Sequence, residues 1–125
     1  MPKKVLVVDD SILLHRMYEL ALKSYARAEI APVLASDGRE AFVRLQEHPD
    51  VVLILLDVNM PAMSGLEFLE RLRAEPAFRD VRVVLQSTED QIQDVRRGLA
   101  AGAVGYLTKP FTPRQLHQLL DVVLV

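Results

Sequence analysis

The sequence predicts an α/β fold in which a five-stranded parallel sheet is covered on both faces by five helices. Short apolar runs rich in β-branched residues, typical of strands, alternate with longer segments whose apolar residues recur at helical spacing. The run Val51–Leu56 has no polar residue to face water, as expected of a strand covered on both sides. Short connections in such an alternation require right-handed crossovers and therefore a parallel sheet.

Five segments are expected to form the strands. Three are compact apolar runs and two are weaker candidates, at residues 30–35 and 105–108. Pro32 has no backbone N–H to donate, which favours an edge position for the strand that contains it. In chain order the predicted strands are 5–8, 30–35, 51–56, 81–85 and 105–108.

Five further segments are expected to form helices. Three of them begin after a residue whose side chain can accept a hydrogen bond from the first turn, and these are Ser11, Asp37 and Thr112. The third helix is expected at 65–74 and the fourth at 91–101, with Gly102 as its C-terminal cap. The first helix is predicted to bury its apolar residues Ile12, Leu13, Met17, Leu20 and Ala21. The fourth is predicted to bury Ile92, Val95 and Leu99.

Length and composition limit the possible functions. The 125 residues suit one domain, residues 1–125, and no linker or repeat divides them. A net charge of −2 argues against direct binding of nucleic acid, which needs a basic surface. The absence of cysteine excludes disulfides and zinc–thiolate sites. No apolar stretch approaches the length of a membrane span and no leader pattern is visible, so we expect a cytoplasmic location.

Polar residues of complementary type follow four of the predicted strands. In a parallel sheet all carboxyl ends lie on one edge, where ligands bind in folds of this class. Far-apart residues should therefore meet there: Asp9 and Asp10, then Asp57, then Ser87 and Thr88, and finally Lys109. Turns that only face solvent do not need acidic, hydroxyl and basic residues of complementary charge, so ordinary turns do not explain this combination.

This set of side chains suits phosphoryl transfer. Clustered carboxylates repel one another unless a cation neutralises them, and oxygen ligands suit Mg²⁺. Lys109 could neutralise one phosphoryl oxygen and a hydroxyl could hydrogen-bond another, which is how such reactions are catalysed. Asp57 would then be the nucleophile and would form an aspartyl phosphate.

At these residues the chain resembles the receiver domains of two-component response regulators, especially stand-alone receivers of the chemotaxis type. The resemblance runs along essentially the whole chain, in order and with matching spacing. It implies the flavodoxin-like strand order 2-1-3-4-5, for which the chemotaxis receiver is itself a standard example. The matching segments are Val7–Ser11, Leu55–Pro61, Ser64–Gly65, Ala101–Ala103 and Tyr106–Phe111.

The resemblance also implies roles for individual residues. Asp57 would be the phosphoacceptor and Lys109 the residue that contacts the phosphoryl group, with a cis bond to Pro110. Mg²⁺, or Mn²⁺, would be held by Asp9, Asp10, Asp57 and the backbone carbonyl of Asn59. Ser87 would be the switch hydroxyl and Tyr106 the switch aromatic residue.

The implied function is a signalling switch and not a turnover enzyme. The phosphoryl group would come from a sensor histidine kinase or a phosphotransfer protein, and a downstream protein would bind the surface of the fourth helix, fifth strand and fifth helix.

Two positions depart from the family pattern. Thr88 replaces a small residue, which leaves Thr88 as a second candidate hydroxyl, although the spacing to Lys109 favours Ser87. Val104 and Gly105 replace acidic residues, which weakens the case for a charged dimer interface and favours a monomer or weak dimer.

Two alternatives remain open. One is a pseudo-receiver that binds partners without being phosphorylated, although a pure scaffold has no reason to keep like charges clustered. The other is a phosphatase of the haloacid-dehalogenase type. Such enzymes need an acid two residues after the nucleophile, and Asn59 occupies that position.

Overall fold

The computed structural model describes residues 2–60 and 63–124, apart from the side chain of Glu89. Pro61 of the motif after Asp57 lies outside the described residues. Five parallel strands form one sheet in the order β2-β1-β3-β4-β5, which confirms the predicted α/β class and strand order. Pro32 lies in β2, at an edge of the sheet as predicted. The strands are β1 (Lys3–Val8), β2 (Ile30–Ala35), β3 (Val51–Asp57), β4 (Arg82–Ser87) and β5 (Gly105–Thr108).

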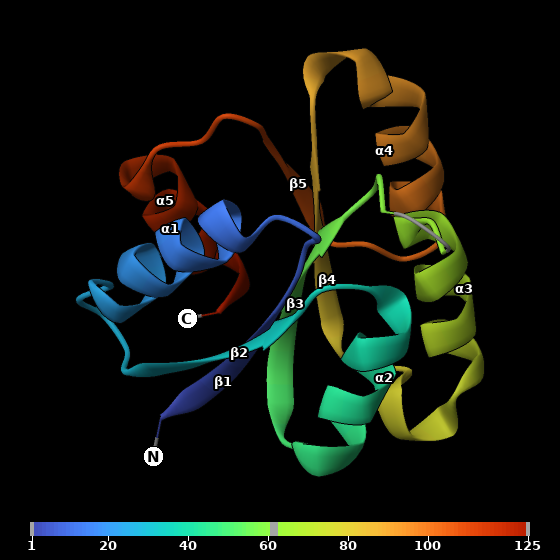
Figure 1. Ribbon diagram of the computed structural model, residues 1–125, viewed down its shortest axis with the longest axis horizontal. Helices are drawn as coiled ribbons and strands as arrows, with labels where there is room; N and C mark the ends of the chain where they lie inside the picture. Colours follow the sequence, from blue (N-terminus) through green and yellow to red (C-terminus); the bar gives the residue numbers. More distant parts are fainter. Residues whose placement is uncertain (1, 61–62, 125) are drawn as a thin grey trace.

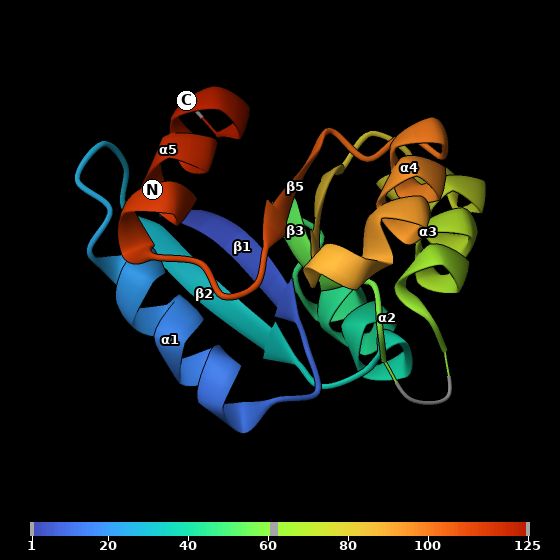
Figure 2. The same cartoon turned by 90° about the horizontal axis from the view of Figure 1, so that it is seen from above.

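Helices cover both faces of the sheet. Figures 1 and 2 show α1 and α5 on one face and α2, α3 and α4 on the other. Among the described residues, every helix is too short or too polar to cross a bilayer. The helices are α1 (Ile12–Lys23), α2 (Gly38–Glu47), α3 (Gly65–Ala74), α4 (Ile92–Ala100) and α5 (Pro113–Val123), with 3₁₀ turns η1 (Pro76–Phe78) and η2 (Glu89–Gln91).

The side chains of the central strands alternate between two buried layers. Val5 and Val7 of β1 pack with the residues of α1 and α5, whereas Leu6 and Val8 pack with those of α2 and α3. This alternation follows from the two-residue period of a strand. From Val5 to Val8 and from Leu53 to Leu56 both faces of these strands are therefore buried, which explains why these segments are continuous apolar runs.

The predicted buried face of α1 is wrong. Of the five residues named for it, only Ala21 is buried; the other four are exposed, by 40% (Met17) to 75% (Ile12). The helix instead buries His15, Tyr18, Ala21 and Leu22. These residues also recur at helical spacing, but two of them carry polar atoms and so contribute little to an apolar pattern. The sheet accepts them because their polar atoms find partners: the His15 Nε2 lies 2.6 Å from the Asp9 carbonyl oxygen.

The prediction for α4 is correct at one position of three. Val95 is buried, but Ile92 and Leu99 are 45% and 40% exposed. The helix approaches the sheet through Gly98, where an added Cβ would lie 2.1 Å from a methyl carbon of Leu85. A glycine at the contact lets the helix lie close to β4, and the flanking apolar residues stay partly in solvent.

The predicted helix boundaries are largely confirmed. The side chains of Ser11, Asp37 and Thr112 accept hydrogen bonds from the backbone N–H three residues later, at 3.2, 2.8 and 3.1 Å. Gly102 follows α4 with φ +106°, a left-handed conformation that favours glycine and ends the helix. Ser64 caps α3 in the same way as the three predicted caps, through the Glu67 N–H at 3.2 Å.

Candidate functional site

The topology brings the predicted site residues to one edge of the sheet. Asp9 directly follows β1 and Asp57 is the last residue of β3, and the register pairs the residues before them, Val8 with Leu56. Ser87 is the last residue of β4, and its carbonyl accepts the backbone N–H of Lys109 at 2.7 Å. The four residues are thus neighbours because their strands are neighbours.

A glycine allows α3 to begin beside Asp57. The Gly65 N–H donates to the Val58 carbonyl at 3.2 Å. A Cβ at position 65 would lie 2.4 Å from the Asp57 carbonyl oxygen and 2.8 Å from the Val58 Cα, both of them backbone atoms. Only a residue without a side chain fits here, so Gly65 helps to fix where the backbone of Asp57 lies.

The Asp57 carboxylate is buried but has partners on both oxygens. The Asn59 N–H donates to Oδ1 at 3.1 Å, and the Lys109 Nζ lies 3.3 Å from Oδ2. Burial raises the pKa of the Asp57 carboxyl above its ordinary value of 3.8, and the negative charge of Asp9 adds to this shift. The Asn59 N–H and the Lys109 ammonium lower the pKa and oppose part of the shift.

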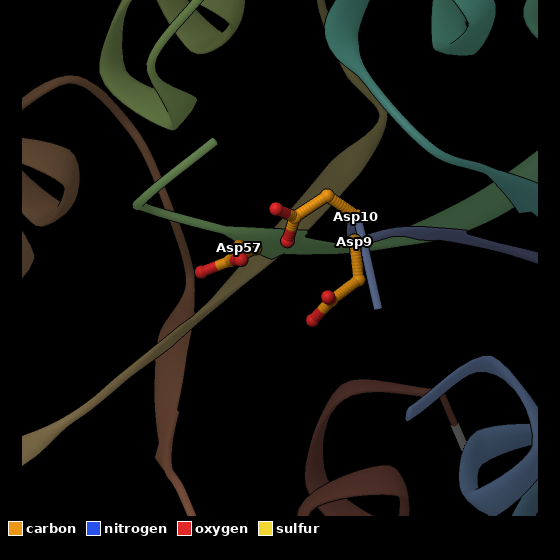
Figure 3. Close-up of side chains that lie close together, drawn as sticks. All are labelled: Asp9, Asp10 and Asp57. Carbon is orange, nitrogen blue, oxygen red and sulfur yellow. The ribbon is translucent and has the colours of Figure 1, made fainter. Parts of the chain in front are cut away.

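The two aspartates after β1 differ in their surroundings. Asp9 is fully buried: its Oδ1 accepts the Ser11 N–H at 2.8 Å, and its Oδ2 lies 3.2 Å from the Lys109 Nζ. Asp10 is exposed at the rim. Figure 3 shows the side chains of Asp9, Asp10 and Asp57 gathered at this edge of the sheet.

This cluster could hold a metal ion. Asp9, Asp10 and Asp57 each offer one carboxylate oxygen, and these oxygens all lie within 4.8 Å of one another. The donors are all hard oxygen atoms, as Mg²⁺ requires, and the exposed Asp10 leaves the site open to water, which Mg²⁺ usually keeps as a ligand. The residues present therefore fit a divalent cation of this kind.

The two candidate hydroxyls at the end of β4 lie in different environments. Ser87 is buried, with 3% of its surface exposed. Thr88 is exposed, and its hydroxyl donates to the Asp90 carboxylate while Thr88 begins the turn η2. The Thr88 hydroxyl is therefore held at the start of this turn.

The remaining predicted site residues lie on β5 and on the segments that follow β3 and β5. Tyr106 of β5 is 46% exposed. Lys109 is half-buried, and the peptide bond to Pro110 is cis, as the resemblance implied. The Asn59 side chain is exposed, and its backbone N–H is the group that contacts Asp57.

Two polar residues next to the cluster were missed in the sequence. Gln86 of β4 is buried and its Nε2 donates to the Asp9 Oδ2 at 2.9 Å. Tyr18 of α1 is buried as well, and its hydroxyl donates to the Gln86 Oε1. A signal for Gln86 was present, because it is a lone amide that directly follows the apolar residues Val83, Val84 and Leu85 of a predicted strand. Tyr18 shares a stripe of helical spacing with His15, Ala21 and Leu22, but the more apolar stripe of α1 is the stronger signal in the sequence.

Comparisons with known proteins agree with this architecture. Residues 5–121 match the response regulator receiver domain. The chemotaxis protein CheY1 of Helicobacter pylori strain J99 is 35% identical over 121 residues, which cover 97% of this chain and 96% of that protein. The phosphate regulon transcriptional regulatory protein PhoB of Escherichia coli K12 is 36% identical over 125 residues, which cover only 52% of that longer protein.

A solved structure shows the same fold. The chemotaxis protein CheY4 of Vibrio cholerae, crystallised at low pH, is 37% identical and superimposes with a TM-score of 0.87, covering 99% of this chain and 100% of that one. Family match, sequence identity and superposition all extend over nearly the full length. The chain therefore belongs to the family of response regulator receiver domains and is similar to receivers of the chemotaxis type.

Proposed function

We propose that this chain is a phosphorylation-activated switch, with Asp57 as the phosphoacceptor. The observation that carries the proposal is the position of the Asp57 carboxylate: it is buried beside Asp9, and its Oδ2 is 3.3 Å from the Lys109 ammonium. A buried carboxylate with a cation at one side and an acidic pair at the other has the partners that phosphoryl transfer needs.

In the proposed reaction, an oxygen of Asp57 attacks the phosphorus of a phosphohistidine on a sensor histidine kinase or a phosphotransfer protein. The O–P bond forms, the P–N bond breaks, and the imidazole leaves with the bond's electron pair and takes a proton from water. Asp9, Asp10, Asp57 and the Asn59 carbonyl would hold Mg²⁺ or Mn²⁺, which when bound would neutralise charge on the phosphoryl oxygens. Lys109 neutralises part of the same charge from the β5 side.

The proposed switch uses Ser87 and Tyr106. Ser87 is the better candidate hydroxyl because it is buried at the strand end, whereas the Thr88 hydroxyl is already bonded to Asp90. Tyr106 is half exposed in this structure, so its side chain is not fixed in the core, and we expect it to move inward when Ser87 shifts toward a phosphoryl group. That movement would reshape the surface of α4, β5 and α5, which a downstream protein would bind.

The switch acts through binding and not through turnover of a substrate, and it needs no direct contact with nucleic acid. We expect residues 1–125 to act as one receiver domain that is a monomer or a weak dimer. The cytoplasmic location stays a prediction from the sequence.

The test is the formation of an acyl phosphate on Asp57. The protein is incubated with acetyl phosphate and Mg²⁺, and its intact mass is measured before and after treatment with hydroxylamine. We expect a hydroxylamine-labile gain of one phosphoryl group, its loss in Asp57→Asn, and its retention in the matched control Asp50→Asn, whose carboxylate is exposed at the opposite end of β3.

The alternatives give different results. A pseudo-receiver would show no adduct on the unmutated chain, with or without Mg²⁺. A phosphatase of the haloacid-dehalogenase type would release phosphate steadily from phosphomonoesters. Either result would overturn the proposed function.

A further inference from the structure

Two buried polar side chains are not used by the proposed phosphoryl transfer. Tyr18 of α1 has none of its surface exposed and Gln86 of β4 only 1%. They are linked in a chain that ends at the acidic cluster: the Tyr18 hydroxyl donates to the Gln86 Oε1, and the Gln86 Nε2 donates to the Asp9 Oδ2 at 2.9 Å. Burying polar groups costs free energy unless they are paired, so both residues need this arrangement to be stable.

The direction of this chain is set by Tyr18. A buried amide can turn about its last bond and present either its oxygen or its NH₂ group to a neighbour. The Tyr18 hydroxyl donates to the oxygen of Gln86 and so turns the NH₂ group toward Asp9. Burial raises the pKa of Tyr18 well above 10, which keeps the hydroxyl protonated as a donor.

Packing holds the Tyr18 ring in place. Its centroid is 4.7 Å from that of Phe111, which is buried on the segment that follows Lys109 and Pro110. The aromatic pair fills the space between α1 and the start of α5, so the hydroxyl has a fixed position relative to β4.

The contact with Gln86 decides how Asp9 is oriented. The Oδ1 of Asp9 is fixed by the Ser11 N–H at 2.8 Å, and the Oδ2 has two neighbours, the Gln86 amide and the Lys109 ammonium at 3.2 Å. Without the amide, Lys109 would be the remaining partner of Oδ2. The carboxylate would then be held at Oδ2 by an ammonium that it shares with the Asp57 Oδ2 at 3.3 Å, and it would be less firmly fixed in the position in which its oxygen lies near those of Asp10 and Asp57.

We propose that Tyr18 and Gln86 are positioning residues that hold the Asp9 carboxylate in the orientation a divalent cation needs. This inference rests on the proposed function, since it concerns the cation site of that reaction. Groups that hydrogen-bond metal ligands commonly set metal affinity by fixing the ligand's orientation. Gln86 acts on Asp9 directly, and Tyr18 acts only through Gln86.

The test is the affinity of the unphosphorylated protein for Mn²⁺, measured by the electron paramagnetic resonance signal of the free ion. Gln86→Leu removes the amide and keeps a similar volume, and we expect it to weaken Mn²⁺ binding about tenfold. Tyr18→Phe removes one oxygen and keeps the ring, and we expect a smaller loss. In the double variant, Tyr18→Phe should cause no further loss, because its effect passes through Gln86.

A matched control separates positioning from stability. Tyr25→Phe removes the hydroxyl of a second buried tyrosine, which donates to the Asp121 carboxylate at 2.6 Å, beyond the far end of α1. It should lower the melting temperature but leave the Mn²⁺ affinity unchanged. A merely structural role for Tyr18 would give Tyr18→Phe the same outcome.

The possible results distinguish this inference from the function on which it rests. If the unmutated protein binds Mn²⁺ and Tyr18→Phe binds it equally well, the positioning role is overturned and the proposed function stands. Additive losses in the double variant would also overturn it. If the unmutated protein binds no Mn²⁺, both the inference and the proposed cation site fail. Should Gln86→Leu not fold, Tyr18→Phe and its control still decide the question.

Discussion

Replacing Lys109 with methionine would leave two buried carboxylates without their cation. The Lys109 Nζ lies 3.2 Å from the Asp9 Oδ2 and 3.3 Å from the Asp57 Oδ2, and the two carboxylate side chains are 0% and 4% exposed. With an effective dielectric constant of about 20, each of these contacts is an attraction of about 5 kcal/mol. Bringing the three charged groups out of water offsets much of this attraction in the unmutated protein.

The variant loses the attraction but keeps the cost of burying the two carboxylates. Removing one partner of a buried ion pair lowers the free energy of unfolding by about 3–5 kcal/mol, and we expect Lys109→Met to fall in this range at pH 7. The loss should shrink as the pH falls, because a proton on Asp57 removes one of the two charges. Mg²⁺ should also reduce the loss, because without the competing Lys109 ammonium the folded variant should bind the cation more tightly than the unmutated chain does, and tighter binding stabilises the folded state more.

The measurement is urea unfolding with and without Mg²⁺, at neutral pH and at a lower pH where the fold persists. Lys4→Met is the matched control: the Lys4 Nζ is 3.1 Å from the Asp50 carboxylate, but both side chains reach solvent, so the loss should be below about 1 kcal/mol. The electrostatic reasoning would be refuted if Lys109→Met lost no more free energy of unfolding than the control. It would also be refuted if the loss changed with neither pH nor Mg²⁺.

Three further predictions concern stability, and urea unfolding checks each of them. Burial raises the pKa of Asp57 above 3.8 in the folded chain, so the folded chain holds this proton more tightly than the unfolded chain does. The gain in stability from Asp57→Asn should therefore grow as the pH rises from 3.8 through the folded pKa, and then level off. A gain that stays constant with pH would contradict this. Gly65→Ala should cost about 1–3 kcal/mol, because its Cβ would meet backbone atoms at 2.4 and 2.8 Å; an unchanged or higher stability would show that the backbone yields easily. Leu20→Ser, at a side chain that is 73% exposed, should change stability by less than about 0.5 kcal/mol. Leu22→Ala, at a fully buried side chain, should cost about 2–5 kcal/mol. The reverse order would mean that α1 buries the face expected from the sequence.

The sheet and the meeting of the site residues were predictable from the sequence. Continuous apolar runs identify central strands of a parallel sheet, and such a sheet places the ends of β1, β3, β4 and β5 on one edge. Asp9, Asp57 and Lys109 can therefore be expected to meet although they are far apart in the chain. That prediction depends on backbone topology alone and needs no knowledge of side-chain contacts.

The orientation of helix faces was less predictable. Two stripes of α1 recur at helical spacing: an aliphatic one with Leu13 and Leu20, and a mixed one with His15 and Tyr18. Hydrophobicity alone favours the first stripe, and the folded chain buries the second. The difference lies in hydrogen bonds to groups in or directly after the strands, which no local pattern reveals, since the partners are Asp9, Ala35 and Gln86.

The misassigned face and the missed residues have one physical origin. A polar side chain in a dry core is stable only where a partner of matching chemistry lies within hydrogen-bond distance. Gln86 in β4 and Tyr18 in α1 break the apolar pattern of their elements, and each supplies the partner that the other needs. The Gln86 amide has a second polar group, its NH₂, and this group donates to Asp9, the most deeply buried charge of the acidic cluster. Tyr18 and Gln86 are therefore compatible with this core only as a pair, and the pair is compatible with this sheet only next to an acceptor such as Asp9.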